Sequence, residues 1–566
     1  MEYSCVSFTD LPDEILMIIC QKLNNFDVLY CLKGVNQRID RIVHDSTFTT
    51  RLNFVKWSKC GFISLLHCDT ILDRYCLQIL PDIHDKIKCL SLEASSMKHI
   101  LCATDYPNLS SLALYNIDEE SIRYLSTKDL IADDYYIAVV ILTFFLVYIM
   151  YLCLDENLSS EIFKNQIRAL GLVINRNHEG YEMFETTANI FNSIFVVFTR
   201  LTTLILSESS YKNRVRLAFN VSLFSNFHSS TLLRLFINVQ CFDECLCILD
   251  GRFIHLHTLY VDLSNIHSSD EIQTQADLPN LKRFSISCNY ETCDYNDTIP
   301  PLLHRMFNLE ELILCLTVYQ DKIFIDGNSL KKDIINHMPR LNRFSFSIES
   351  FIFTNNQINL PSTEDIQCTF VDFSNTKVIS YVDYFAKTGQ GRCLSYTYPS
   401  LMQYYGIITN NFPGGSFINV RIVSLFDEHP FEHEFFNRIQ KSFPFMGSLS
   451  IKNDKPQNIK QFHGLINDNR NFSLIEYPFL NELTLVRVHD DYIEQFLLHC
   501  KASFQDINLS INYESLQRIT HGFTRDDTRI NCAKINKLDL YSADKKHCNY
   551  LQEYFPCAKI CYRGIF

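Results

Sequence analysis

The sequence is poor in the residues that loosen a chain. It has 15 Gly and 15 Pro in 566 residues, well under the usual values of about 7% and 5%. This scarcity excludes collagen-like, low-complexity and linker-dominated chains. Hydrophobic residues make up 47% of the chain, which is enough for a large core. At about 150 residues per domain, the length predicts about four domains or one long repeat array.

Basic residues are also in short supply. The chain has 51 Lys and Arg against 64 Asp and Glu, which gives a formal net charge of -13. A general nucleic-acid binder normally presents a basic face. We therefore expect no nucleic-acid partner, although the acid excess is compatible with a local basic patch.

A secretory signal and a recognisable metal motif are both missing. The first fifteen residues lack a basic segment followed by an apolar core. The 22 cysteines are scattered, mostly inside apolar runs, where free Cys behaves as a small hydrophobe. The nearest metal-like cluster, with no CxxC pair, is Cys241, Cys245 and Cys247 before His255 and His257. We expect reduced thiols, no metal, no cofactor, and a cytoplasmic or nuclear protein.

One apolar run stands out, from Tyr135 to Leu154. It contains twenty residues without a charge, enough to cross a bilayer as a helix at about 1.5 Å per residue. Lys128 and Lys164 lie at similar distances on its two sides, so the positive-inside rule gives no orientation. Three interpretations stay open: a membrane span, a buried helix within the repeats, or a foreign insertion such as translated non-coding sequence.

The first fifty residues predict a small three-helix unit. Pro12, Asp13 and Glu14 suit a first helical turn. Apolar residues then recur on one helix face, and two shorter amphipathic segments follow within residues 27–43. A unit of about forty residues is marginal alone. It should need a partner or a neighbouring domain.

This stretch resembles the F-box. The family pattern is Leu-Pro-x-Glu-(Ile/Leu), an apolar helix ending in Leu, an Asp-(Leu/Val)-Leu step, and Val before polar residues. It is met by Leu11, Pro12, Glu14, Ile15, Ile19, Leu23, Asp27, Val28, Leu29, Leu32 and Val35. The resemblance covers about forty of the 566 residues. One departure is Ile39, where the family often has an aromatic residue.

The resemblance implies a docking surface for the Skp-type adaptor of cullin–RING ubiquitin ligases. The matching contact positions are Leu11, Pro12, Ile15, Leu16 and Leu29. A unit this small cannot hide so many Leu and Ile side chains, and exposed apolar patches mark interfaces. The alternative is that these residues only pack against the next domain.

A second pattern recurs along the chain, Leu-x-x-(Leu/Phe)-x-apolar. It starts at Leu109, Leu201, Leu232, Leu256, Leu281, Leu309, Leu341 and Leu480, with weaker copies from Ile87 and Ile535. Between the starts at 201 and 341 the steps are 31, 24, 25, 28 and 32 residues. This resembles a degenerate leucine-rich repeat, whose units run about 20–29 residues. Each copy predicts a short strand, and intervening stretches such as 326–337 and 492–500 predict helices.

The predicted fold class is therefore α/β: a three-helix F-box followed by an irregular leucine-rich-repeat-like solenoid of short parallel strands and helices. We expect the F-box at residues 1–50, linker helices at 51–84 and the repeat domain at 85–566, interrupted by 135–154. Residues 350–475 fit the repeat worst. The alternative is an ordinary α/β core whose strands carry Leu.

Polar strand positions would lie on or near the concave face of such a solenoid. They are Thr202, Thr203, Arg234, His257, Lys282, Arg283, Glu310, Glu311, Asn342 and Arg343. Both charges occur among them, so they name no ligand class.

No phosphate-binding loop, dinucleotide fingerprint or nucleophile elbow is present. One enzyme motif needs weighing: His429-Pro430-Phe431-Glu432-His433 matches the HxxEH zinc signature. Pro430 leaves His429 at a helix end, where it is badly placed to share a metal with His433. Solvated histidines beside acidic residues are the favoured interpretation.

We therefore predict a non-catalytic substrate-recognition subunit of an SCF-type cullin–RING ubiquitin ligase. The F-box would dock the adaptor, and the repeats would hold an unidentified target protein. The alternatives are a repeat scaffold without a ligase role, a membrane-anchored form of it through 135–154, and a zinc hydrolase at His429 and His433.

Overall fold

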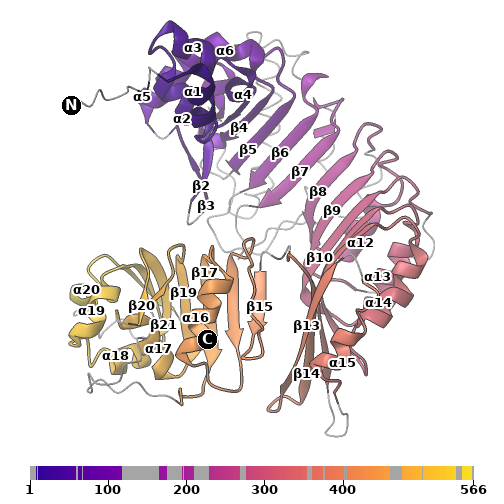
Figure 1. Cartoon of the computed structure of the whole chain (residues 1–566), viewed down its shortest axis with the longest axis vertical. Helices are drawn as coiled ribbons and strands as arrows, with labels where there is room; N and C mark the ends of the chain where they lie inside the picture. The colour runs from indigo at the N-terminus through magenta and orange to yellow at the C-terminus, as the bar shows by residue number, and fades with distance from the viewer. Residues whose placement is uncertain are drawn as a thin grey trace, which may run out of the picture. The chain divides into compact units, whose positions relative to one another are not determined.

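The computed structural model of the chain begins with helices and continues into parallel sheets (Figure 1). It describes residues 8, 11–58, 61–66, 68–117, 165–174, 194–195, 197–208, 228–267, 276–353, 360–373, 376–400, 402, 404–458, 474–499, 501–542 and 551–563.

The described N-terminus forms three short helices, α1 (Asp13–Cys20), α2 (Asn25–Leu32) and α3 (Gln37–Val43), and then the single helical turn α4 (Ser46–Thr49). Two asparagines set their boundaries, because each accepts backbone N–H groups at a helix start. The Asn24 side chain caps α2 and the Asn36 side chain caps α3. Three helices at the predicted positions are therefore present.

Residues 51–64 form strands, where the sequence had suggested helices. The strands are β1 (Arg51–Asn53), β2 (Val55–Ser58) and β3 (Gly61–Ser64). β2 and β3 pair as an antiparallel hairpin. Val, Trp, Phe and Ile in these strands favour a pleated surface over a helix. Helices follow only afterwards: α5 (Asp69–Arg74), the π-helix η2 (Tyr75–Ile79), α6 (Leu80–Ile83) and the 3₁₀ turn η3 (His84–Lys86).

The described chain is mixed α/β and divides into two compact units. The first contains residues 1–313 and 337–344, and the second contains residues 314–336 and 345–566. The sequence had pointed to one repeat domain from residue 85 to the end.

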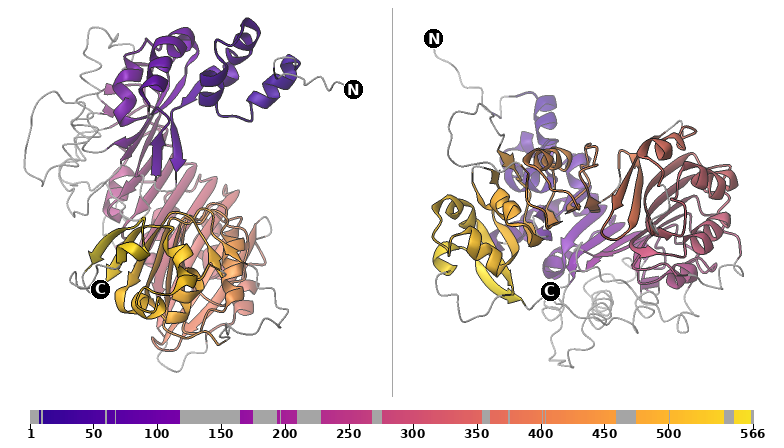
Figure 2. Two further views of the ribbon diagram at one scale, coloured as in Figure 1. Left: turned by 90° about the vertical axis from the view of Figure 1, so that its left-hand side faces the viewer. Right: turned by 90° about the horizontal axis from the view of Figure 1, so that it is seen from below.

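A parallel sheet forms the body of the first unit. Its strands stand in the order β1-β4-β5-β6-β7-β8-β9-β10, and β4 to β10 run side by side (Figure 1, Figure 2). Their bounds are β4 (Cys89–Glu93), β5 (Ser111–Ile117), β6 (Ala169–Ile174), β7 (Thr203–Glu208), β8 (Arg234–Val239), β9 (Thr258–Leu263) and β10 (Arg283–Thr292). Between the strands lie η4 (Ala94–Ser96), α7 (Met97–Leu101), α12 (Phe242–Ile248) and α13 (Tyr295–His304).

The repeat pattern explains where these strands begin. In each strong copy the strand starts at the third residue of the pattern, as at Thr258 after Leu256 and at Arg283 after Leu281. The second and third apolar residues then alternate with polar ones, and the apolar side chains are buried. Adjacent strands pair in register, for example Thr258 with Arg283. The prediction of short parallel strands is confirmed for these copies.

The second unit contains one antiparallel interruption. β11 (Glu311–Gln320), most of which lies in this unit, and β12 (Arg343–Phe353) belong to the same sheet as β14 (Gln390–Tyr398) and β13 (Lys377–Phe385). β14 pairs antiparallel with both β12 and β13. The repeat period is lost after residue 350 because the chain forms this hairpin. A short turn can join two antiparallel strands, so no crossover helix is needed between them.

A second parallel sheet follows, in the order β15-β16-β17-β19-β21-β22-β23. Its strands are β15 (Tyr404–Ile408), β16 (Ile422–Phe426), β17 (Ser448–Asn453), β19 (Glu482–Val488), β21 (Ile507–Asn512), β22 (Ile535–Tyr541) and β23 (Lys559–Arg563), beside a small pair β18 (Ile475–Glu476) and β20 (Ala502–Ser503). Along the chain, α14 (Gly327–Asp333) and η7 (Ile335–His337) lie between β11 and β12, and α15 (Thr363–Cys368) lies between β12 and β13. The helices between the strands of the second parallel sheet are α16 (His433–Ser442), α17 (Asp490–Leu497), α18 (Tyr513–Ile519), α19 (Asp526–Cys532) and α20 (Leu551–Tyr554). Helices predicted within 326–337 and 492–500 are confirmed as α14 with η7 and as part of α17.

The apolar run 135–154 lies outside the described residues. Among the residues that are described, no helix has both the length and the apolar character needed to cross a membrane.

Candidate functional site

The three N-terminal helices share a small core of their own. Its buried side chains are Leu16, Cys20, Phe26, Val28, Leu29, Ile39, Ile42 and Val43. α1 is tied to α3 by Arg38, whose Nε lies 2.6 Å from Asp13 Oδ1 and whose Nη2 donates to Leu11 O. The unit therefore holds a defined arrangement despite its size.

The five predicted adaptor-contact residues separate into two groups. Leu16 and Leu29 are fully buried in this core. Pro12 is exposed, Ile15 is 43% exposed and Leu11 is half-buried. As the unit stands, Pro12 and Ile15 are the ones that offer apolar surface, while Leu16 and Leu29 position the helices beneath.

Apolar exposure continues along α1. Ile18 is 52% exposed and follows Pro12 and Ile15 at a spacing of three residues. Residues three apart are neighbours on a helix surface, so Pro12, Ile15 and Ile18 form one stripe, here called the α1 stripe. Leu23, which follows the helix, is also 52% exposed, and Val35, between α2 and α3, is 53% exposed. Sequence periodicity had placed Ile15 and Ile18 on one face but could not say that this face is open.

The helical unit rests on the segment that follows it through α2. The ring of Phe26 stacks on Tyr75 with centroids 4.9 Å apart, and Tyr75 Oη donates to Phe26 O over 2.6 Å. Lys33 and His44 both contact the Asp82 carboxylate. Phe26, which is not one of the five predicted contact residues, therefore packs against the following segment, whereas the α1 stripe stays exposed.

Polar residues at the strand starts form ion pairs at one end of their row. Lys282 lies 3.1 Å from Glu310, Arg283 lies 3.4 Å from Glu311, and Arg343 reaches the same Glu311 at 3.2 Å. Near the middle of the row, Arg234 Nε donates to Thr203 Oγ1 over 2.9 Å. Other members of the row, Thr202, His257 and Asn342, are half-buried or exposed.

The HxxEH motif does not form a zinc site. α16 begins only at His433, so His429 lies outside the helix. The His429 ring is 81% exposed, with Nδ1 3.3 Å from Asp427 Oδ1, whereas His433 is buried with Nδ1 3.3 Å from Gln495 Oε1. The two rings thus have different partners in different environments. Across the described chain, no three His, Cys, Asp or Glu side chains gather as a metal site, and the zinc-hydrolase alternative is overturned.

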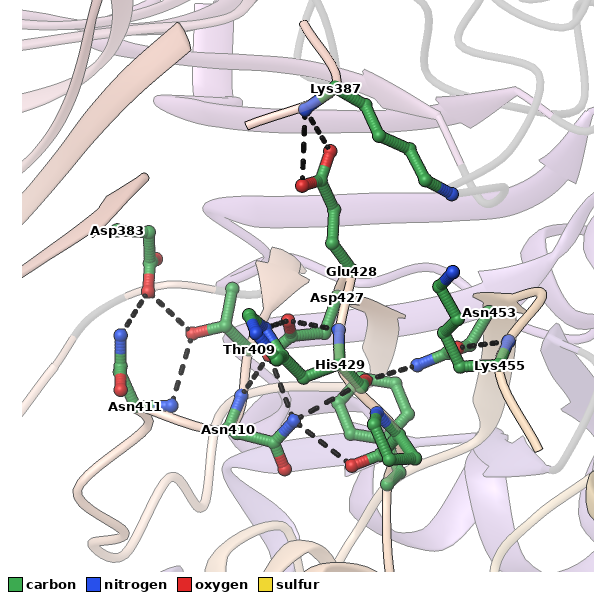
Figure 3. Close-up of polar contacts among 12 residues, drawn as sticks. Asp383, Lys387, Thr409, Asn410, Asn411, Asp427, Glu428, His429, Asn453 and Lys455 are labelled. Carbon is green, nitrogen blue, oxygen red and sulfur yellow. Dashed lines mark hydrogen bonds and ion pairs between the residues drawn. The ribbon is translucent and has the colours of Figure 1, made fainter. Parts of the chain in front are cut away.

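Around His429 lies a polar network at the carboxyl ends of β15, β16 and β17 (Figure 3). Asp427 Oδ2 accepts from Asn410 N over 2.7 Å and from Asn410 Nδ2 over 2.9 Å, and its Oδ1 accepts from His429 N over 2.9 Å. Asn453 Nδ2 donates to His429 O over 2.8 Å. The side chains of Asp427 and Asn453 thus form hydrogen bonds with backbone groups of the loops, and these bonds join successive strand–loop units.

The network connects to a buried charge cluster. Asp383 Oδ1 accepts from Thr409 Oγ1 over 2.8 Å and from Asn411 Nδ2 over 2.9 Å (Figure 3). Its Oδ2 lies 2.7 Å from Arg392 Nη1, and Arg392 Nε contacts Glu349 Oε1. Arg392 is fully buried and Asp383 is 3% exposed. Such a cluster fixes the hairpin in place, because none of its charges is left without a partner.

Among the described residues, the cysteines form no disulfide bond. Burial raises the pKa of Cys245 to about 12 and that of Cys393 to about 12, so both thiols are protonated near neutral pH. Cys241 precedes α12, where the Glu244 carboxylate accepts from Cys241 N over 2.8 Å. Cys245 and Cys247 lie buried within α12, so the cysteines of the candidate metal cluster belong to this helix and its cap. Cys31 is exposed, although it lies in an apolar run.

Sequence reasoning missed the residues of the polar network around His429. Asn410, Asp427 and Asn453 each follow or end an apolar strand. A polar residue repeated at that point is a signal that could have been found. The Asp383–Arg392 pair had no such signal, because only the hairpin brings the two residues together.

No family model matches the chain, and no curated protein matches it significantly. Among solved structures, the crystal structure of the Rad7 and Elc1 complex in yeast is aligned over 99% of this chain and 89% of that chain. The sequence identity is 12% and the TM-score is 0.23. At that level the likeness carries no inference about fold or function.

Proposed function

We propose that this chain is a substrate-recognition subunit of an SCF-type ubiquitin ligase. The N-terminal helices would dock a Skp-type adaptor, and the repeat sheets would hold a target protein. The observation that carries the proposal is the α1 stripe, which exposes apolar side chains on a unit that already has a buried core. It supports the docking role that the F-box resemblance implies, since exposed apolar patches mark interaction sites.

The mechanism is proximity. A subunit that holds target lysines beside an activated thioester raises their effective concentration and needs no catalytic residue. Within the contact set implied by the resemblance, Pro12, Ile15 and Leu11 would meet the adaptor. Leu16 and Leu29 would shape the surface from inside.

The test is a pull-down of the full-length chain with purified Skp-type adaptor. Ile15→Glu with Ile18→Glu places two charges on the α1 stripe without touching the core. A lost interface anchor costs about 2 kcal/mol or more, so adaptor capture should fall below detection. The matched control is Ile323→Glu with Ile530→Glu, whose side chains are 70% and 51% exposed elsewhere.

Two results would count against the proposal. One is a folded wild-type chain that fails to capture the adaptor, which would favour a repeat scaffold without a ligase role. The other is equal capture by the stripe and control variants.

A further inference from the structure

The first unit gathers basic residues along one edge of its sheet. They lie at the first residue, or directly before the first residue, of the strands β1, β4, β6, β8 and β10. They are Arg51, Lys88, Arg168, Arg234, Lys282 and Arg283, and all six are exposed. From β1 to β10 no acidic residue occupies either of these positions. We call this set the basic edge.

The strand order places these residues on β1 and β4, which are neighbours, and then on every second strand, β6, β8 and β10. Arg51 pairs with Cys89, the residue after Lys88. Arg168 directly precedes Ala169, whose strand pairs with the start of β7. Arg234 begins β8, two strands beyond β6. Since strands lie about 4.8 Å apart, the five steps from β1 to β8 span about 24 Å.

Charge is left over along most of this edge. At its far end, Glu310 and Glu311 pair with Lys282 and Arg283. Arg51, Lys88 and Arg168 form no ion pair with any side chain in the described part of the chain. The nearest acidic residues before the strand starts, such as Asp85 in η3 and Asp277 in a loop, precede the basic edge in the sequence. A chain with a net charge of -13 thus presents a row of uncompensated cations.

We propose that the basic edge binds an acidic polypeptide segment. That this segment belongs to the target protein rests on the proposed function. Charge complementarity selects the occupant, because clusters of Arg and Lys are a recurring mode of acidic-motif recognition. An extended segment advances about 3.4 Å per residue. About seven residues running across the strand starts would therefore pass Arg51, Lys88, Arg168 and Arg234 in turn.

The experiment is a fluorescence-anisotropy titration of the full-length chain with a labelled ten-residue peptide of alternating Glu and Ser. A Lys-Ser peptide of equal length and a ten-nucleotide oligothymidine are the comparison probes. The variant is Lys88→Glu with Arg168→Glu, since neither side chain has an ion-pair partner to lose among the described residues. Its control is Lys332→Glu with Lys441→Glu, which makes the same charge change at exposed positions outside the basic edge.

The acidic peptide should bind the wild type and the control alike, and at least about tenfold more weakly to the edge variant. Added salt should weaken it further, because exposed charges are screened. No binding to the wild type, equal binding to both variants, or tighter binding of the oligonucleotide would each overturn the proposal. Adaptor capture is scored separately: the edge variant should retain it, so a failure of the docking role and a failure of the basic edge give different results.

Discussion

The two parallel sheets use polar residues in opposite ways. In the first unit, basic side chains gather where the strands begin and are exposed, and Arg51, Lys88 and Arg168 form no ion pair within the described residues. In the parallel sheet of the second unit, polar side chains gather where the strands end, and Asp427 and Asn453 are buried and hydrogen-bonded.

The difference separates two tasks within similar strand architecture. A buried polar group that has its partners stabilises one arrangement, and losing a partner is costly. An exposed charge without a partner contributes little to stability and is available to another molecule. The carboxyl-end network should therefore matter for folding, and the basic edge for binding.

The largest effect should come from Arg392, a fully buried cation of the second unit. Arg392→Met leaves the carboxylates of Asp383 and Glu349 buried without their counter-charge. Removing one partner of such a pair typically costs about 3–5 kcal/mol. We expect a marked fall in the urea midpoint, followed by circular dichroism. Arg168→Met, at an exposed position, should change the free energy of unfolding by less than about 0.5 kcal/mol. Similar losses in both variants would erase the contrast between the two units.

A smaller loss should follow from Asp427→Ala. The change leaves Asn410 N and His429 N without their acceptor, at a cost of about 1–3 kcal/mol. The comparison is Asp454→Ala, which removes a carboxylate that is 69% exposed and pairs with Lys387 on the surface. Exposed pairs contribute about 0–1 kcal/mol. Melting temperatures should thus rank the Asp427 variant below the Asp454 variant, and the reverse order would contradict a structural role for the network.

Much of the strand layout could be predicted from the sequence, because it follows from local alternation. Leu109, Leu256 and Leu480 each precede a strand by two residues. The strands β6 and β17 were not recognised as copies of the pattern, because Ile167 and Met446 occupy the position at which the pattern requires Leu. An apolar side chain of another shape serves the same buried position.

The hairpin and the buried cluster could not be predicted in the same way. Gly389 has φ +59°, a conformation that favours glycine and marks the turn between β13 and β14. A Gly-Gln-Gly stretch among polar residues names no pairing partner, however. The burial of Arg392 depends on β12, β13 and β14 together. In the candidate docking site, the F-box resemblance pointed to Ile15 and Leu16, but only tertiary packing decides that Leu16 is buried and Ile15 exposed.

The link between the helical unit and α6 should respond to pH. The hydrogen bond from Lys33, aided by His44, lowers the pKa of Asp82. A lowered pKa means that the contribution to stability is present above the ordinary Asp value of about 3.9 and is lost as pH falls through the folded-state pKa. The melting-temperature gap between wild type and Asp82→Asn should be largest above about pH 5 and close in acid. Asp69→Asn, at an exposed α5 position, should show no such trend, and a parallel trend would remove the assignment to Asp82.

The smallest effect on stability should belong to Lys88→Glu with Arg168→Glu. Two reversals of two charge units each move the net charge from -13 to -17, yet neither side chain loses an ion pair within the described residues. Exposed substitutions of this kind usually stay within about 0.5 kcal/mol, so the melting temperature should match that of Lys332→Glu with Lys441→Glu. A clear drop confined to the edge variant would show that these cations stabilise the first unit itself. The basic edge would then stabilise the fold, as the Asp427 network does. The assignment of binding to the first sheet and of stability to the second would be wrong.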